Sequence, residues 1–177
     1  KYGKAAQDTL PPNESDEINE ERQREIQRIV GAVLFFARAL DSTNLVSLSS
    51  LASEQTKATE ITEAKCKQLL DYLATHPDPV VRFYASDMIL NIHSDASYLS
   101  EPQAKSRVGG YFFLGSVPKP NLPIPLNGSI HVVASILKFV VASAAEAELG
   151  GLFVNCKEGK IIRLILEELG HKQPPTP

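Results

Sequence analysis

The sequence has 177 residues, of which 43% are hydrophobic and 22% are charged, with a formal net charge of −3. This composition is typical of a soluble globular protein with one ordinary domain or two small ones. No apolar run approaches the roughly 20 residues of a membrane span, and the first ten residues lack a secretion signal. We therefore expect an intracellular protein, in the cytoplasm or nucleus, without a membrane partner. The missing initial Met suggests a fragment of a longer protein.

Charge is divided unevenly along the chain. Residues 1–78 contain 9 Lys and Arg against 13 Asp and Glu, whereas residues 79–177 contain 9 against 8. Neither part has the concentrated basic stripe of a nucleic-acid-binding domain. Because Lys and Arg usually supply most of the affinity for phosphates, any nucleic-acid affinity is expected to come mainly from elsewhere.

The first half of the chain reads as an arm followed by helices. Residues 1–17 include "LPPNESDE" and show no apolar periodicity, which predicts a linker or extended arm. From residue 18 to about Leu40, apolar residues recur at steps of three and four, which predicts an amphipathic helix. Its expected buried residues are Ile26, Ile29, Val30, Val33, Leu34 and Ala37.

Two further helices are predicted before residue 78. "LVSLSSLASEQ" (45–55) places Leu45, Leu48, Leu51 and Ala52 on one side. In "TEITEAKCKQLLDYLATHP" (59–77), Leu69, Leu70 and Leu73 form the apolar stripe, either Thr59 or Thr62 can cap the start, and the prolines end the helix. Residues 18–78 are therefore expected to form a three-helix unit.

The second half changes to an extended pattern and ends in a helix. "VVRFYA" (80–85), "MILNIHSDAS" (88–97), "GGYFFLGS" (109–116) and "GSIHVVASILKFV" (128–140) predict strands, and three successive strands imply a meander. Asn127-Gly128 is a turn signal before the last strand. A helix is expected from about Ser143 to Gly170, with its buried side formed by Ala145, Leu149, Leu152, Phe153 and Cys156.

These elements predict an α+β fold with α/β-like character, in which a helical first half precedes a β-β-β-α unit over residues 79–177. The two cysteines, Cys66 and Cys156, are too far apart for a disulfide framework or a zinc motif. We expect both to be buried as small apolar residues.

Asp95 is the first candidate for chemistry, because it lies where a predicted strand leaves the core. Glu146 and Glu148 lie in the first turns of the helix that must cross the sheet. Carboxylates brought together from a strand and a helix form a site suited to Mg²⁺ or Mn²⁺. The alternatives are that Asp95 is a turn residue and that both glutamates are solvated, and the helical periodicity does not choose between Glu146 and Glu148.

His93 shares a strand face with Asp95 and could be a further ligand or support one. The neighbouring residues of "HSD" point to opposite faces of a strand, which excludes a hydrolase triad made from them.

Several sequence blocks together resemble the Pol polyprotein of copia-type long-terminal-repeat retrotransposons, most strongly over residues 26–170. They are "IQRIVGAVLFFARALD", "CKQLLDYLATHPD", "NIHSDASYLSEPQAKSRVGGYFFLG", "NGSIHVVASILKFVVASAAEAELGGLFVNCKEG" and "LILEELG". The matching region runs from the end of the reverse transcriptase into its ribonuclease H domain. Val30 to Phe36 is similar to the family's "Val-Gly-x-Leu-x-Tyr" helix, with Phe in place of Tyr, and "SAAEAELG" is similar to its "SSTEAEY" helix.

The resemblance implies a ribonuclease H fold, with a mixed sheet flanked by helices, that cuts the RNA strand of RNA/DNA hybrids with Mg²⁺ or Mn²⁺. Asp95 corresponds to the first-strand catalytic aspartate. Glu148, followed by Leu149-Gly150-Gly151, corresponds to the metal-binding acid of the helix. Residues 18–78 would be the thumb or connection region.

The family takes a third carboxylate from the strand that follows this helix, and the sequence ends at Pro177, before that strand. The resemblance therefore implies a truncated domain with weak or absent cleavage. We also expect an unpaired sheet edge that favours self-association. The alternative function is that of a non-catalytic retroelement remnant acting as a protein-interaction module.

Overall fold

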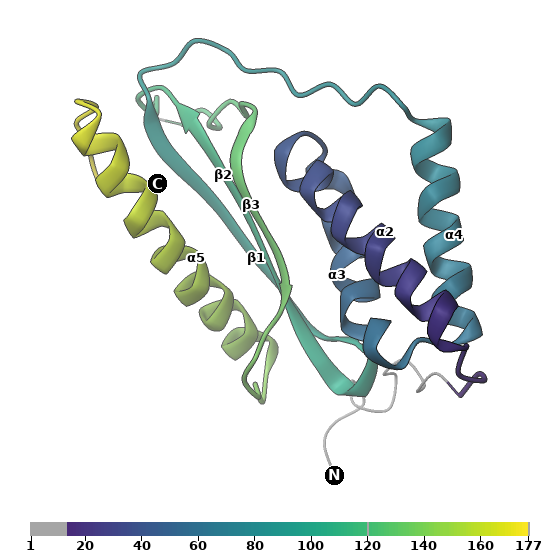
Figure 1. The fold of residues 1–177 in the computed structure, drawn as a ribbon. Coiled ribbons are helices and arrows are strands. Elements are labelled where there is room, and N and C mark those ends of the chain that lie inside the picture. Colours follow the sequence, from purple (N-terminus) through teal and green to yellow (C-terminus); the bar gives the residue numbers. More distant parts are fainter. Residues whose placement is uncertain (1–13, 120, 177) are drawn as a thin grey trace. The chain divides into compact units, whose positions relative to one another are not determined.

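The computed structural model describes residues 14–119 and 121–176, and the chain divides into two compact units at Val80/Val81. Helices make up the regular structure of the first unit, whereas the second combines a sheet with one long helix (Figure 1). The described chain is thus mixed helix and sheet, as the α+β prediction requires. The sequence placed the border at residue 78.

The first unit contains α2 (Glu20–Ala39), α3 (Leu45–Glu54) and α4 (Glu60–Thr75). Short 3₁₀ turns, Ser42–Asn44 and Gln55–Lys57, separate the three helices. All three predicted helices are confirmed. Cys66 is buried, as predicted, and this burial raises the pKa of its thiol. Leu70 was predicted to belong to the buried stripe of α4, but it is exposed. The buried apolar side chains of these helices are Ile26, Val30, Ala37, Leu45, Leu48, Leu51, Cys66 and Leu69.

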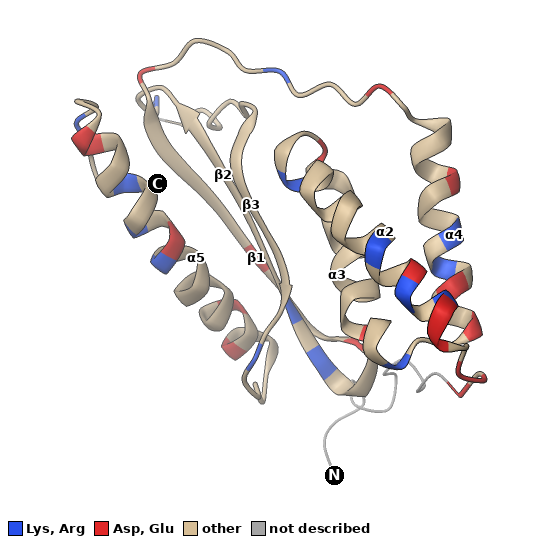
Figure 2. Cartoon of the chain, in the orientation of Figure 1, with Lys and Arg blue, Asp and Glu red and all other residues tan. Residues whose placement is uncertain are grey.

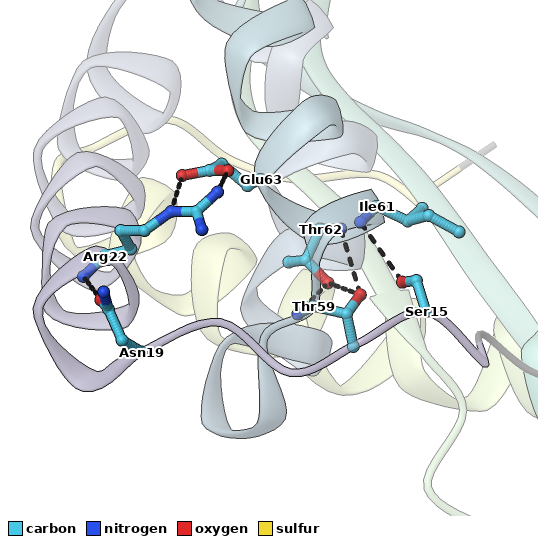
Figure 3. Close-up of polar contacts among 7 residues, drawn as sticks. All are labelled: Ser15, Asn19, Arg22, Thr59, Ile61, Thr62 and Glu63. Atoms are coloured by element: carbon cyan, nitrogen blue, oxygen red, sulfur yellow. Dashed lines mark hydrogen bonds and ion pairs between the residues drawn. The ribbon is translucent and has the colours of Figure 1, made fainter.

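Polar contacts fix the helix starts of this unit (Figure 3). Thr59 and Thr62 form a capping box at the start of α4, so both residues suggested by the sequence take part. The Nε of Arg22 donates to the Oε1 of Glu63 at 2.7 Å, and its Nη2 bonds to the other carboxylate oxygen. This hydrogen bond lowers the pKa of Glu63 and raises that of Arg22.

The segment before α2 is attached to the start of α4. Glu17 forms an isolated antiparallel bridge with Thr59, and the amide of Ile18 donates to the carbonyl of Ala58 at 3.1 Å. Residues 14–17 therefore pair through their backbone with the start of α4, which is compatible with the extended arm that the sequence predicted as one of two alternatives. The remainder of the predicted arm, residues 1–13, lies outside the described residues.

The second unit is built on a three-stranded antiparallel sheet in the order β1-β2-β3, which confirms the meander. The strands are β1 (Ile89–Glu101), β2 (Lys105–Gly115) and β3 (Ser129–Ile136). The strand predicted over residues 80–85 is wrong, because these residues have no regular structure. The backbone of Tyr84 pairs instead with the side chain of Asn127, whose Oδ1 accepts at 2.7 Å and whose Nδ2 donates at 2.9 Å.

Helix α5 (Ala144–Glu168) packs against β1 and β2 through small residues. Its buried positions include Ala147, Gly150, Gly151, Asn155 and Gly159. The prediction of which side of α5 is buried is wrong. Leu149 is 67% exposed and Phe153 is 62% exposed. The other residues predicted on that side are also exposed, namely Ala145, Leu152 and Cys156. At Gly159 the helix lies so close to the sheet that an added Cβ would collide with Ile92, which leaves no room for a large side chain there.

Candidate functional site

Asp95 lies inside β1 and opposite Gly109 of β2, rather than at the end of a strand as predicted. Its neighbours face α5: the Oγ of Ser94 accepts from the Nδ2 of Asn155 at 2.8 Å, and Ala96 lies against Gly151. Because successive strand residues point to opposite faces, the side chains of His93 and Asp95 lie on the face away from α5. Both are exposed and share that face, as the sequence predicted.

The two candidate glutamates of α5 have different surroundings. Glu146 stabilises the helix start: its Oε2 accepts from the amide of Ala142 at 2.6 Å, and its own amide donates to the Oγ of the N-cap residue Ser143 at 3.1 Å. Glu148 is exposed and has no hydrogen bond or ion pair within the described residues. Glu146 thus has a structural role, which leaves Glu148 as the free carboxylate.

Asp95 and Glu148 border the same strand edge from opposite sides of the sheet. Gly150 contacts Phe139, which follows β3, so this flank of α5 faces the β3 side. Glu148 is two residues, or about 200°, from Gly150, and it therefore lies on the flank toward the outer edge of β1. The described residues contain no group of three or more His, Cys, Asp or Glu side chains placed to hold a metal. Two separated carboxylates of this kind can bind a divalent cation only weakly.

The outer edge of β1 is covered at its start by a side chain from the C-terminal segment. The Oε1 of Gln173 accepts from the amide of Leu90 at 2.9 Å, and its Nε2 donates to the carbonyl of Met88 at 2.9 Å. Arg163 of α5 in turn donates to the carbonyl of Gln173. Gln173 thereby takes the place of a neighbouring strand at this end of β1.

Asn155 is a second buried amide that sequence reasoning missed. Its side chain is fully buried between α5 and the sheet, where Nδ2 donates to Ser94 and to the carbonyl of Gly109, each at 2.8 Å. A Cβ on Gly110 would collide with Asn155. Gly110 therefore provides the space that Asn155 occupies against the sheet.

Arg107 of β2 lies on the same sheet face as Asp95 and forms a buried ion pair with Glu101, Nε to Oε1 at 2.7 Å. Its two terminal nitrogens have no hydrogen-bond partner among the residues that the structure describes. Elsewhere, charged residues gather at the starts of α2 and α4 (Figure 2), where acids complement the helix dipole.

Comparisons with protein-family models, with curated proteins and with solved structures gave no match. In the part of the chain that the structure describes, no helix combines the length and apolar character needed to cross a membrane.

Proposed function

We propose that this chain is a segment of a copia-type retrotransposon Pol polyprotein, with residues 18–78 from the reverse transcriptase thumb or connection and residues 79–177 from the ribonuclease H domain. The activity of the longer protein is hydrolysis of the RNA strand of an RNA/DNA hybrid with Mg²⁺ or Mn²⁺. One observation carries the proposal beyond the sequence blocks. Asp95 lies in the first of three antiparallel strands, and Glu148 in the first turns of the helix that follows them and packs on their sheet.

In this proposal, Asp95 and Glu148 hold the divalent cations that activate water and stabilise the leaving oxygen. Their positions on either side of the outer edge of β1 are consistent with a third carboxylate arriving on a strand that pairs there. We expect the 177 residues by themselves to bind the cation weakly and to cleave slowly or not at all.

The test is a cleavage assay with a labelled RNA/DNA hybrid and Mg²⁺ or Mn²⁺. It compares the 177-residue chain with a form extended by a strand that supplies the third carboxylate. We expect cleavage by the extended form, and its loss in Asp95→Asn and in Glu148→Gln. Glu146→Gln is the matched control and keeps the activity, because glutamine can still accept the capping hydrogen bond. An inactive extended form would contradict the proposed function, and strong cleavage by the 177-residue chain would contradict the incomplete site.

The second candidate function is a non-catalytic remnant that acts as a protein-interaction module. It is favoured by the bulky apolar side chains that α5 leaves exposed, among them Leu149 and Phe153. Size-exclusion chromatography with light scattering, together with a pull-down, tests this candidate. A monomer that captures no partner would remove it.

A further inference from the structure

Within the part of the chain that the structure describes, strand β1 has an unpaired backbone edge in the middle of its length. The amide of Leu90 bonds to Gln173 instead of β2, so the N–H and C=O groups of the even-numbered residues point outward. Within the described residues, no hydrogen bond reaches the outward backbone groups of Ile92, Ser94 and Ala96. Gln173 covers one end of this edge, and the pairing register shifts after Ser97 at the other. Residues 92–96 are therefore open to another strand.

Two common protections of an edge strand, Lys and Pro, are missing from this segment. Strand β1 has 13 residues and contains neither Lys nor Pro. We propose that residues 92–96 pair with the same residues of a second copy of this chain, in an antiparallel dimer whose two-fold axis passes through Ser94. This inference goes beyond the proposed function, because it concerns self-recognition and requires no cation.

The charges on β1 select this register. With the axis at Ser94, His93 lies opposite Asp95 of the second copy, and the symmetry repeats the contact. An axis at His93 would place the two imidazoles opposite each other, and an axis at Asp95 would oppose two carboxylates, which is unfavourable. Asp95 has no ion pair within the described residues, since the nearby Arg107 is paired with Glu101.

The backbone hydrogen bonds are compatible with this register. In the dimer, Ser94 faces Ser94 of the second copy, and Ile92 faces Ala96 of the second copy. The N–H and C=O groups of these residues all point outward, so each facing pair exchanges two hydrogen bonds. The pair formed by His93 and Asp95 then occupies the other kind of position, where Cα atoms are only about 4.5 Å apart and side chains are close. Both side chains are exposed on the face away from α5, where they can meet.

The helices also fit this arrangement. The two-fold axis is perpendicular to the sheet, so both copies of α5 lie on one face. Because α5 packs over β1 and β2 and strands are about 4.8 Å apart, the two helices would be neighbours at roughly the 8–10 Å of packed helices. The flank of α5 opposite Gly150 faces the outer edge and contains Leu152, which is 49% exposed. The dimer would bury this side chain.

A charge exchange tests the proposal by sedimentation of the full 177-residue chain over a range of concentrations. We expect a monomer–dimer equilibrium. His93→Asp opposes two carboxylates and Asp95→Lys opposes two bases, so each should weaken dimerisation about tenfold. The double variant restores opposite charges and should recover the wild-type affinity. Asp71→Lys, the same change at an exposed position of α4, is the matched control and should have no effect.

A cysteine experiment tests the register. In a Cys156→Ser background, the variant with both His93→Cys and Asp95→Cys should form a disulfide-linked dimer on mild oxidation, because opposite residues at this kind of position have suitable spacing. His93→Cys alone should link far more slowly, since residue 93 does not face its own copy. A monomer at every concentration, a dimer insensitive to the charge exchange, or equal linking of the single and double variants would each overturn the proposal.

Discussion

The two units of this chain bury their helices in different ways. In the first unit, α2, α3 and α4 bury most of the large apolar residues of their stripes, with Leu48 and Leu51 almost fully enclosed. In the second, α5 buries glycine, alanine and asparagine against the sheet over most of its length, buries Leu166 only near its end, and exposes Leu149 and Phe153. The difference shows that the apolar stripe of a helix identifies its buried face only where the neighbouring element leaves room for large side chains.

The largest expected difference in stability is between alanine substitutions of two leucines, one from each unit. Leu48→Ala should lower the free energy of unfolding by about 2–5 kcal/mol, because it leaves a cavity in a fully buried position. Leu149→Ala should change stability by no more than about 0.5 kcal/mol, since that side chain is mostly exposed. Both effects are measured by unfolding in denaturant, monitored through amide hydrogen exchange at residues of each unit. Similar losses for the two variants would show that α5 buries its leucine stripe after all.

The next effect contrasts two glycines. Gly110→Ala should destabilise the second unit by about 1–3 kcal/mol, because the added methyl group collides with the buried side chain of Asn155. Gly31→Ala in α2 meets no neighbouring atom and should stabilise the first unit by up to about 1 kcal/mol through helix propensity. Thermal unfolding of both variants measures the contrast, and a neutral Gly110→Ala would contradict the close packing of α5.

The smallest effect concerns the ion pair between α2 and α4. The hydrogen bond from Arg22 lowers the pKa of Glu63 in the folded state. Its contribution to stability is therefore complete above the unfolded-state pKa and is lost as pH falls through the lower, folded-state value. Glu63→Gln should reduce stability slightly at neutral pH and leave it unchanged in acid. Denaturation curves at several pH values test this, and a difference that grows in acid would have the wrong sign.

The sequence allowed the helices of the first unit and the meander of the second to be predicted, because apolar periodicity and the Asn127-Gly128 turn are local signals. The position of Asp95 within its strand was harder to predict. The polar residues after it indicated the end of the strand, but they continue to pair with β2 as far as Ser97. The roles of Asn155 and Gln173 could not be predicted. They contact residues more than 40 and more than 80 positions away, and no local pattern encodes such contacts.

The exposed strand edge is central to both the proposed function and the proposed dimer, because a further strand or a second copy would pair there. Residue-resolved amide hydrogen exchange of the full chain at low concentration tests it most directly. We predict slow exchange at Leu90, which Gln173 protects, and at His93 and Asp95, which pair with β2. Fast exchange is expected at Ile92, Ser94 and Ala96, with protection appearing as concentration rises. Uniform protection of residues 90–96 in the dilute protein would contradict an open edge.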